Sequence, residues 1–220
     1  MSNNWINYWS GNNIWSSSSI WKKNSKILSL NLNKIVKIKN KSILDIGCGT
    51  GELIDNFIPE AKKIYGVDIS SNYIKTCKLK FKNQKKVVIK LFKSNFKKLN
   101  KLNQKFDIIV CNSVIQYFSY ESQIIELVKI VKKVSKKGSI FLISDIMDIN
   151  DKKNYLKLLY YSIIRGYLFL LLKQYLILLI NPKYRRLEKK YKLLRIDSKK
   201  VAKKLSRLSN KLEILEDPLT

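Results

Sequence analysis

Short apolar runs rich in isoleucine and valine recur along the chain, with helix-like segments between them. These runs occupy residues 42–47, 63–68, 87–92, 106–111 and 139–145. Each run is nearly unbroken in apolarity, which is typical of strands that are covered on both faces. Because the runs alternate with helices, the pattern predicts an α/β fold with a parallel sheet and right-handed crossovers.

Capping residues and apolar periodicity place the helices between these strands. Ser70 or Ser71 can cap a helix that ends near Phe81, and Ser122 opens another helix before the fifth run. The apolar face of this second helix consists of Ile125, Val128, Val131 and Val134. Gly138 is then expected to close the turn into the fifth strand.

The two ends of the chain are less regular than its middle. The first 40 residues hold all four tryptophans, which predicts an aromatic-rich arm with one helix over 27–38. Residues 155–180 form an unusually apolar block, and a basic segment follows it. Three roles fit this block: a lid or substrate-pocket helix, a surface for dimerisation or membrane contact, or a membrane span. The last residues predict a helix and then a sixth strand over 211–216.

Composition favours a folded protein with a strong positive charge. Apolar residues make up 45 % of the 220 residues, enough for a buried core. The net charge of +28 is carried mostly by lysine, which is over-used together with asparagine and isoleucine. This joint excess is typical of an AT-rich coding sequence and makes general coding bias the preferred source of the charge. Nucleic acid is disfavoured as a partner because arginine, whose planar guanidinium suits phosphate and base recognition, is scarce.

The chemistry available to the side chains is limited. The chain has three cysteines without a CxxC pair and no histidine, so neither a disulfide framework nor a metal site is expected. A reducing cytoplasm is the natural setting for such a chain. The N-terminal residues lack the basic region and apolar core of a secretory signal.

Three of the seven glycines lie within five positions, directly after the first predicted strand. Gly47, Gly49 and Gly51 stand where a tight turn leads from a strand into a helix, and a glycine there lets the backbone approach a bulky ligand. Their G-x-G-x-G spacing differs from the dinucleotide fingerprint, and no phosphate-binding G-K-[ST] follows. A nucleoside is therefore the expected ligand. Asp68 ends the second strand, where a carboxylate can accept hydrogen bonds from both ribose hydroxyls.

These motifs resemble those of class I S-adenosylmethionine-dependent methyltransferases. "LDIGCGTG" (44–51) matches the first motif of that family, and "GVDIS" (66–70) matches the acidic motif after the second strand. "FDIIVCNSVIQYF" (106–118) resembles the fourth-strand motif, and "VSKKGSIFLISDI" (134–146) the turn and fifth strand. The resemblance implies a doubly wound, mostly parallel Rossmann-like sheet of seven strands, with a helical insertion after the fifth.

The resemblance also implies where S-adenosylmethionine binds. The glycines would line its methionine portion, Asp45 would lie near its amino group, Asp68 would hold the ribose, and Ile69 would pack on the adenine. The full set of implied cofactor residues is Asp45, Gly47, Cys48, Gly49, Thr50, Gly51, Asp68, Ile69, Asn95, Phe96 and Asn112. By this reading residues 1–40 form an arm or lid and 41–150 the cofactor-binding core. Residues 151–195 form the apolar and basic insertion, and 196–220 a last helix and strand of the core.

The sequence departs from the family pattern in two informative places. Asn112 and Ser113 stand where base and some protein amino-methyltransferases have N-P-P-[YF], which argues against methylation of a nucleic-acid base. The chain offers one strand after the insertion, whereas the family's sheet closes with a sixth and a seventh.

Candidate catalytic residues follow from the chemistry. Methyl transfer from a sulfonium is an in-line displacement, and a general base is needed only if the acceptor must lose a proton. Asp145, at the end of the fifth strand, is the first candidate and Tyr117 the second, with Asp148 and Tyr8 as alternatives; proximity alone is the remaining option. Candidate acceptor-contacting or lid residues are Tyr8, Trp9, Trp15, Gln116 and Arg165.

The sequence thus predicts a cytoplasmic methyltransferase that uses S-adenosylmethionine and methylates an oxygen or carbon of a small molecule. The apolar block favours a lipophilic, lipid-linked or sugar-linked acceptor, and peripheral membrane contact is an open alternative for a monomer or homodimer. The rival interpretation is a non-catalytic methyltransferase-like subunit that docks on membrane or RNA. The high charge and the absent last strand favour the rival, whereas the intact cofactor motifs oppose it.

Overall fold

The computed structural model describes residues 3–10, 19–92, 96–150, 160, 163–164, 166, 168–209 and 211–214. Their centre is a sheet in the order β3-β2-β1-β4-β5, in which every neighbouring pair is parallel. The strands are β1 (Ser42–Ile46), β2 (Lys63–Asp68), β3 (Val87–Leu91), β4 (Phe106–Asn112) and β5 (Ser135–Ser144). The expected α/β Rossmann-like fold is therefore confirmed, and the described residues contribute five strands to it.

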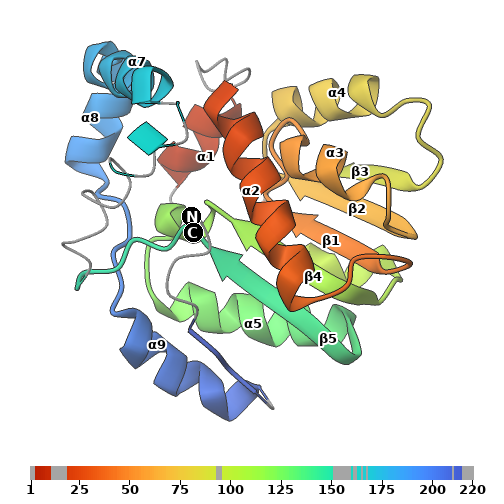
Figure 1. The fold of residues 1–220 in the computed structure, drawn as a ribbon. Coiled ribbons are helices and arrows are strands. Elements are labelled where there is room, and N and C mark those ends of the chain that lie inside the picture. Colours follow the sequence, from red (N-terminus) through yellow and green to blue (C-terminus); the bar gives the residue numbers. More distant parts are fainter. Residues whose placement is uncertain are drawn as a thin grey trace.

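Helices cover both faces of the sheet (Figure 1). On one face lie α2 (Ser19–Ile35), α3 (Glu52–Phe57) and α4 (Ser71–Lys80); on the other lie α5 (Ser122–Val134), α9 (Ser198–Leu205) and the short 3-10 helix η1 (Phe96–Leu102). Alternate β1 residues face opposite layers: Ile43 packs with the α2–α4 layer, while Leu44 and Ile46 pack with the α5–α9 layer.

Local capping and periodicity decide these helices much as the sequence indicates. Ser70 is the N-cap of α4, and its hydroxyl accepts a hydrogen bond from the Tyr73 backbone N–H at 3.2 Å. Helix α5 begins at Ser122 as predicted, and Val128, Val131 and Val134 are buried. Its most buried face is turned slightly from the predicted one, because Ile124 and Leu127 are buried and Ile125 is only partly so.

Three predictions about element boundaries are wrong. Helix α2 runs from Ser19 to Ile35, so it begins before the predicted residue 27 and ends before the predicted residue 38; residues 19–26 contain no proline or glycine that would stop it. Gly138 lies inside β5 rather than in a turn before it: β5 begins directly after α5, and the pairing register with β4 shifts between Phe106 and Ile108. Gly138 adopts φ 75° within that irregular, exposed stretch. The predicted sixth strand is not formed at residues 211–214.

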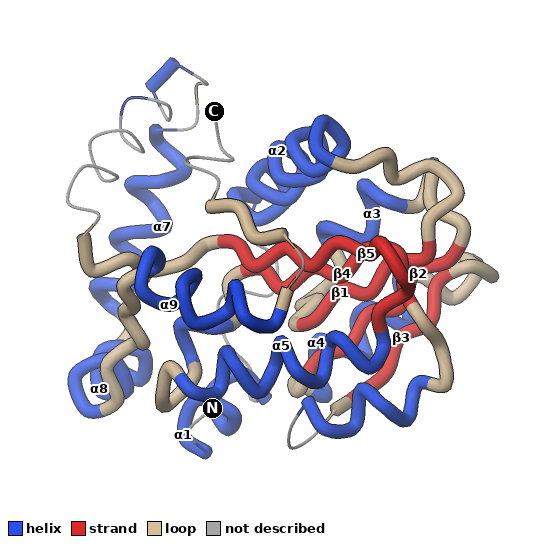
Figure 2. The backbone as a smooth tube through the Cα atoms, turned by 90° about the horizontal axis from the view of Figure 1, so that it is seen from below, coloured by secondary structure: helices blue, strands red, loops and turns tan. Residues whose placement is uncertain are grey.

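The apolar block after the fifth strand is placed beside the sheet. It contributes α7 (Leu168–Ile180), which is followed by α8 (Pro182–Lys190). Both views show these two helices to one side of the sheet rather than over either face (Figures 1 and 2). In the part of the chain that the structure describes, no helix is long and apolar enough to cross a membrane.

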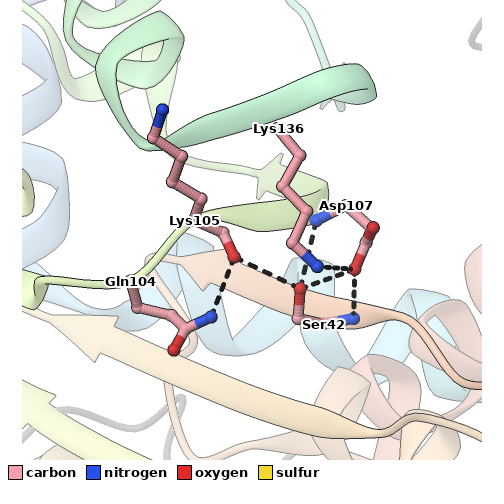
Figure 3. A network of polar contacts seen from close by, with 5 residues as sticks. All are labelled: Ser42, Gln104, Lys105, Asp107 and Lys136. Carbon is pink, nitrogen blue, oxygen red and sulfur yellow. Dashed lines mark hydrogen bonds and ion pairs between the residues drawn. The ribbon is translucent and has the colours of Figure 1, made fainter.

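A polar network ties the amino ends of the three strands β1, β4 and β5 together (Figure 3). The Asp107 carboxylate accepts hydrogen bonds from the Ser42 N–H at 2.8 Å and the Ser42 hydroxyl at 2.6 Å, and it pairs with Lys136 at 2.7 Å. Burial raises the pKa of Asp107, but the hydrogen bonds from Lys136 and Ser42 outweigh it and lower the pKa to about 2. The carboxylate therefore stabilises the edge of the sheet that lies opposite the strands' carboxyl ends.

This network predicts a pH-dependent loss of stability in Asp107→Asn. A carboxyl whose folded pKa lies below its unfolded value stabilises the fold above the unfolded pKa, about 3.9, and stops doing so as the pH falls toward 2. We expect the substitution to lower the free energy of unfolding by about 1–2 kcal/mol at neutral pH, with the difference shrinking below about pH 4. Urea unfolding across this range measures it, with Glu126→Gln on the exposed side of α5 as control. A difference independent of pH would contradict the assignment.

Candidate functional site

The turn after β1 is a backbone elbow built on left-handed glycines. Gly47, Gly49 and Gly51 have φ values of 79°, 54° and 84°. The Gly47 and Cys48 N–H groups donate to the Val67 carbonyl of β2 at 2.8 and 3.1 Å, and Gly51 caps the start of α3. Residues other than glycine adopt such φ values at a cost, so the glycine spacing fixes the path of the elbow.

The three glycines differ in what surrounds them. A Cβ on Gly47 would lie 2.2 Å from Val114 Cγ2, and one on Gly51 would lie 2.5 Å from Phe81 Cε2. A Cβ on Gly49 would have no heavy atom within 4 Å among the described residues. Gly47 and Gly51 are thus required by packing, whereas Gly49 faces open space at the centre of the elbow.

The elbow meets Asp68 at the carboxyl end of β2. The Asp68 carboxylate accepts a hydrogen bond from the Gly49 N–H at 2.9 Å and another from the Ser70 N–H at 2.8 Å. Burial raises the pKa of Asp68, and these N–H groups lower it in part. A carboxylate has about four lone-pair sites, so acceptor capacity remains for further donors. The expected meeting of elbow and carboxylate, which the sequence could only infer from topology, is confirmed.

Asp45 is the most unusual group of the site. Its side chain is buried at 2 % exposure, and its Oδ2 atom has no hydrogen-bond partner among the described residues. Burial, with smaller contributions from the charges of Asp68 and Glu52, raises the pKa of Asp45 to about 8. A buried carboxylate without a partner is unfavourable, so the position suits a ligand that brings a positive charge.

The carboxyl ends of β4 and β5 form a second polar group next to the elbow. The Ser113 hydroxyl donates to the Asp145 carboxylate, and the Ser144 hydroxyl donates to Asn112 Oδ1 at 2.8 Å. Ser113 and Asp145 adopt φ values of 55° and 57°, which are rare for residues other than glycine. Such strained backbone is concentrated at functional sites, so it supports a role for this pair. The sequence singled out Asp145 but gave Ser113 no role, because its partner lies 32 residues away.

Six aromatic side chains gather over this edge of the sheet, and we call them the aromatic cluster: Trp5, Tyr8, Trp9, Tyr73, Tyr117 and Tyr184. They come from α1 (Asn3–Ser10), α4, η2 (Ile115–Tyr117) and α8. The Tyr117 ring lies 5.1 Å from the rings of both Trp5 and Trp9, centroid to centroid. Trp5, Tyr8 and Trp9 belong to the aromatic arm that the sequence predicts, whereas Tyr73 and Tyr184 were missed, because no local pattern reports which distant rings meet.

Hydrogen bonds near both ends of α1 anchor it over the site. Trp5 Nε1 donates to the Tyr191 carbonyl at 3.2 Å, and the Asn72 side chain donates to the Ser10 carbonyl at 3.3 Å. Ile69 packs against the aromatic cluster from the end of β2. The first helix thus spans from the β2–α4 junction to the chain that follows α8.

Burial decides what Tyr117 and Gln116 can do chemically. Burial, followed by the nearby Tyr184 and Asp145, raises the pKa of Tyr117 well above its usual value. Its phenol is therefore protonated at neutral pH and suits a hydrogen-bond donor better than a general base. Gln116 is 6 % exposed, and its Oε1 atom has no partner in the described part of the chain. Both residues belong to η2, which follows β4 in the chain.

The remaining predicted site residues lie at the elbow, at the start of α9, or outside the described part of the chain. Cys48 is buried beside the elbow, and Thr50 donates its hydroxyl to Glu52 within it. Asp148 instead accepts hydrogen bonds from Asn150 and Ser198, which joins it to the start of α9. Trp15, Asn95, Arg165 and the side chain of Phe96 lie outside the described residues.

Comparison with known proteins matches this arrangement to one family. A family profile described as "Methyltransferase domain" matches residues 37–205. The ribosomal protein L11 methyltransferase of Fusobacterium nucleatum is 35 % identical over 130 residues, which cover 58 % of this chain and 39 % of that protein. The ubiquinone biosynthesis O-methyltransferase of Rickettsia bellii is 27 % identical over 120 residues, which cover 54 % of this chain and 47 % of that protein.

The solved structures agree in fold. The PH0226 protein of Pyrococcus horikoshii OT3 aligns with a TM-score of 0.51 and 23 % identity, and the alignment covers 59 % of each chain. The chain therefore spans less than half the length of the two curated relatives named above and shares its core fold with this structure.

Proposed function

The chain belongs to the methyltransferase-domain family, whose class I members use S-adenosylmethionine as methyl donor, and from this premise we propose that it methylates a small-molecule acceptor. The observation that carries the proposal is the junction of the glycine elbow, the Asp68 carboxylate and the buried Asp45, whose Oδ2 atom has no hydrogen-bond partner among the described residues. This junction offers acceptors for ribose hydroxyls, and a buried carboxylate for a cationic amino group. These acceptor groups therefore fit S-adenosylmethionine, in which an adenosyl group and an amino acid are joined through a sulfonium.

Different residues of the chain bind different parts of S-adenosylmethionine. Asp68 accepts hydrogen bonds from the ribose, Asp45 faces the amino group, and Gly49 leaves room for the ligand at the elbow. Ile69 packs on the adenine, next to the aromatic cluster. S-adenosylmethionine, when bound, supplies an electrophilic methyl group on a positively charged sulfur.

The groups that end β4 and β5 serve the acceptor. Asp145, held by the Ser113 hydroxyl, removes the acceptor's proton if one must leave, and the protonated Tyr117 phenol orients the acceptor by donating a hydrogen bond. Helix α1 covers this region and excludes water, which favours reaction in a low-dielectric site.

The acceptor is proposed to be lipophilic, methylated at oxygen or carbon. The apolar rings of the aromatic cluster and the apolar surface of α7 support this choice, as does the similarity to a protein named for ubiquinone biosynthesis. The similarity to a ribosomal-protein methyltransferase points instead to a protein acceptor, so the two classes must be separated by experiment.

Label transfer separates them directly. The full chain is incubated with methyl-tritiated S-adenosylmethionine and a cell extract, and the extract is then divided into organic-soluble, aqueous small-molecule, protein and RNA fractions. The proposal expects the label in the organic-soluble fraction, with Asp68→Ala as the control that loses it. Label confined to protein or RNA would overturn the proposed acceptor class, and no label in any fraction would overturn the activity.

The raised pKa of Asp45 makes a separate prediction about cofactor binding. At about pH 7 a carboxyl with a pKa of about 8 is mostly protonated, and a cationic amino group beside it lowers that pKa. Binding near pH 7 should therefore release most of one proton, and affinity should rise with pH up to about pH 8, above which the ligand's own α-amino group, with an ordinary pKa of about 7.7–8.0, loses its charge. Calorimetry in two buffers of different ionisation enthalpy measures this release. Asp45→Asn should abolish it and Asp107→Asn should keep it; no release by the wild-type protein would contradict the placement.

A further inference from the structure

Helix α7 presents a continuous apolar stripe to solvent. Six of its large apolar side chains are between 42 % and 77 % exposed: Phe169, Leu172, Tyr175, Leu176, Leu179 and Ile180. At 100° per residue these positions span an arc of about 140°, with Lys173 at its margin. Soluble proteins seldom leave so many large apolar side chains together in water unless a partner covers them.

Helix α8 has the opposite chemistry on its outer face. Tyr184 is buried and Leu187 and Tyr191 are partly buried against the aromatic cluster. The exposed positions hold five cations and one acid: Lys183, Arg185, Arg186, Glu188, Lys189 and Lys190. These five cations span an arc of about 160°. An amphipathic helix with such a face is typical of peripheral attachment to an anionic bilayer.

The distribution of arginine separates this segment from the rest of the cationic surface. Lysine is spread along the whole chain, but four of the five arginines lie between residues 165 and 195: Arg165, Arg185, Arg186 and Arg195. A general excess of lysine does not explain this concentration. Guanidinium groups bind phosphate oxygens with two parallel hydrogen bonds, and Arg185 and Arg186 line a surface hollow together with Glu188 and Lys189.

The two helices are joined so that they can act together. Asn181 is the only residue between them, and its side chain caps α8 by accepting a hydrogen bond from the Tyr184 N–H at 2.9 Å. Arg185 donates to the Leu179 carbonyl at 3.4 Å, which fixes the start of α8 to the end of α7. Both helices lie to one side of the sheet (Figures 1 and 2).

We infer that α7 and α8 form a docking surface for an anionic lipid bilayer, with the α7 stripe among the acyl chains and the α8 cations at the phosphate headgroups. Charge and apolar surface together favour an anionic bilayer over a second copy of this chain or a nucleic acid. A second copy of this chain would bring another strongly cationic molecule against the same basic helix, which is electrostatically unfavourable. Nucleic acid would satisfy the cations but leave the α7 stripe in water.

The docking surface also backs onto the proposed acceptor site. The Tyr184 ring, on the inner face of α8, lies 5.8 Å from the Trp5 ring and 5.9 Å from the Tyr8 ring, centroid to centroid. A chain docked through α7 and α8 would therefore hold the aromatic cluster beside the membrane. Bilayer binding stands on its own, whereas delivery of a membrane-resident acceptor to the cluster rests on the proposed function.

Vesicle co-sedimentation of the full chain tests the charge half of the inference. We expect binding to vesicles of three parts phosphatidylcholine to one part phosphatidylglycerol, little binding to pure phosphatidylcholine, and weakening with salt. R185Q/R186Q should weaken binding to the mixed vesicles about thirty-fold. The matched control K132Q/K133Q removes two exposed lysines from the far end of α5 and should change binding less than three-fold. Equal losses in the two variants would overturn the inference, since the cationic surface as a whole would then be responsible.

The apolar half needs its own variant. L172Q/L176Q exchanges two exposed side chains and should leave the thermal unfolding temperature unchanged, while it weakens binding to the mixed vesicles at least about ten-fold. Undiminished vesicle binding by this variant would overturn insertion of α7. Light scattering tests the second copy as occupant: a wild-type dimer that L172Q/L176Q converts to monomer, without vesicle binding by either, would also overturn the inference. None of these readouts depends on methyl transfer.

Discussion

Asp68→Ala is expected to bind S-adenosylmethionine at least about a hundred-fold more weakly than the wild-type protein. The substitution removes the acceptor of two ribose hydrogen bonds, each worth about 1.5–3 kcal/mol when one partner is charged. Together they amount to about two to four powers of ten in affinity. The Gly49 and Ser70 N–H groups lose their acceptor as well, so the elbow is less well held for the ligand. Calorimetric titration with S-adenosylmethionine measures the change.

The control for this prediction is a second, partly buried carboxylate in the same sheet. Asp107 ties the amino ends of β1, β4 and β5 together (Figure 3), whereas Asp68 ends β2 at the carboxyl edge. Asp107→Asn should lower stability yet leave the affinity for S-adenosylmethionine within about three-fold of the wild type. A folded Asp68→Ala protein that binds the cofactor as tightly as the wild type would refute the assignment of this carboxylate to the ribose.

Gly47→Ala is expected to lower the free energy of unfolding by about 2–5 kcal/mol. A residue with a Cβ at φ 79° costs about 1–2 kcal/mol of backbone strain. The new Cβ would also lie 2.2 Å from Val114 Cγ2, and relieving such overpacking costs about 1–3 kcal/mol. Val114 is buried and β-branched, so its side chain has few alternative rotamers to move into. Denaturant unfolding with a linear extrapolation measures the loss.

Two further variants separate strain from overpacking. Gly49→Ala meets no heavy atom among the described residues and should lose only the strain, about 1–2 kcal/mol, while still weakening cofactor binding because its Cβ points into open space at the elbow. Val114→Ala in the Gly47→Ala background should recover the overpacking cost but not the strain. If Gly47→Ala and Gly49→Ala proved equally stable, the close packing of Val114 on the elbow would be wrong.

Local patterns sufficed wherever neighbouring residues determine the structure. The strand at 63–68 was predicted to the residue, because an unbroken apolar run between polar flanks fits one buried strand. Ser70 caps α4 through a hydrogen bond to a residue three positions on, which is a local interaction. The elbow glycines were recognised by their spacing alone. The prediction of Gly138 in a turn failed because a single glycine fits a helix end and an irregular strand equally well.

Contacts between distant segments could not be read from the chain. Ser113 and Asp145 pair across 32 residues, and Trp5 meets Tyr184 across most of the sequence, so no periodicity reports either contact. The raised pKa of Asp45 likewise depends on burial between two layers of helices, which the sequence fixes only through the whole fold. The sequence also left the place of α7 undecided among a lid or pocket helix, a dimerisation or membrane-contact surface and a membrane span. An apolar helix suits each of these environments, so its composition alone does not choose between them.

The sequence by itself determined the parallel α/β architecture, the family and the two motifs that we propose to face the cofactor, since each rests on short runs of neighbouring residues. Only the tertiary structure decided how these parts share one site. It brought Gly49 N–H against the Asp68 carboxylate and left Asp45 Oδ2 without a hydrogen-bond partner in the described part of the chain. It also placed the aromatic cluster, six rings from four segments, over the carboxyl edge of the sheet. The physical reason is that hydrogen bonds and burial act over a few ångströms in space, whereas sequence patterns report only what lies close along the chain.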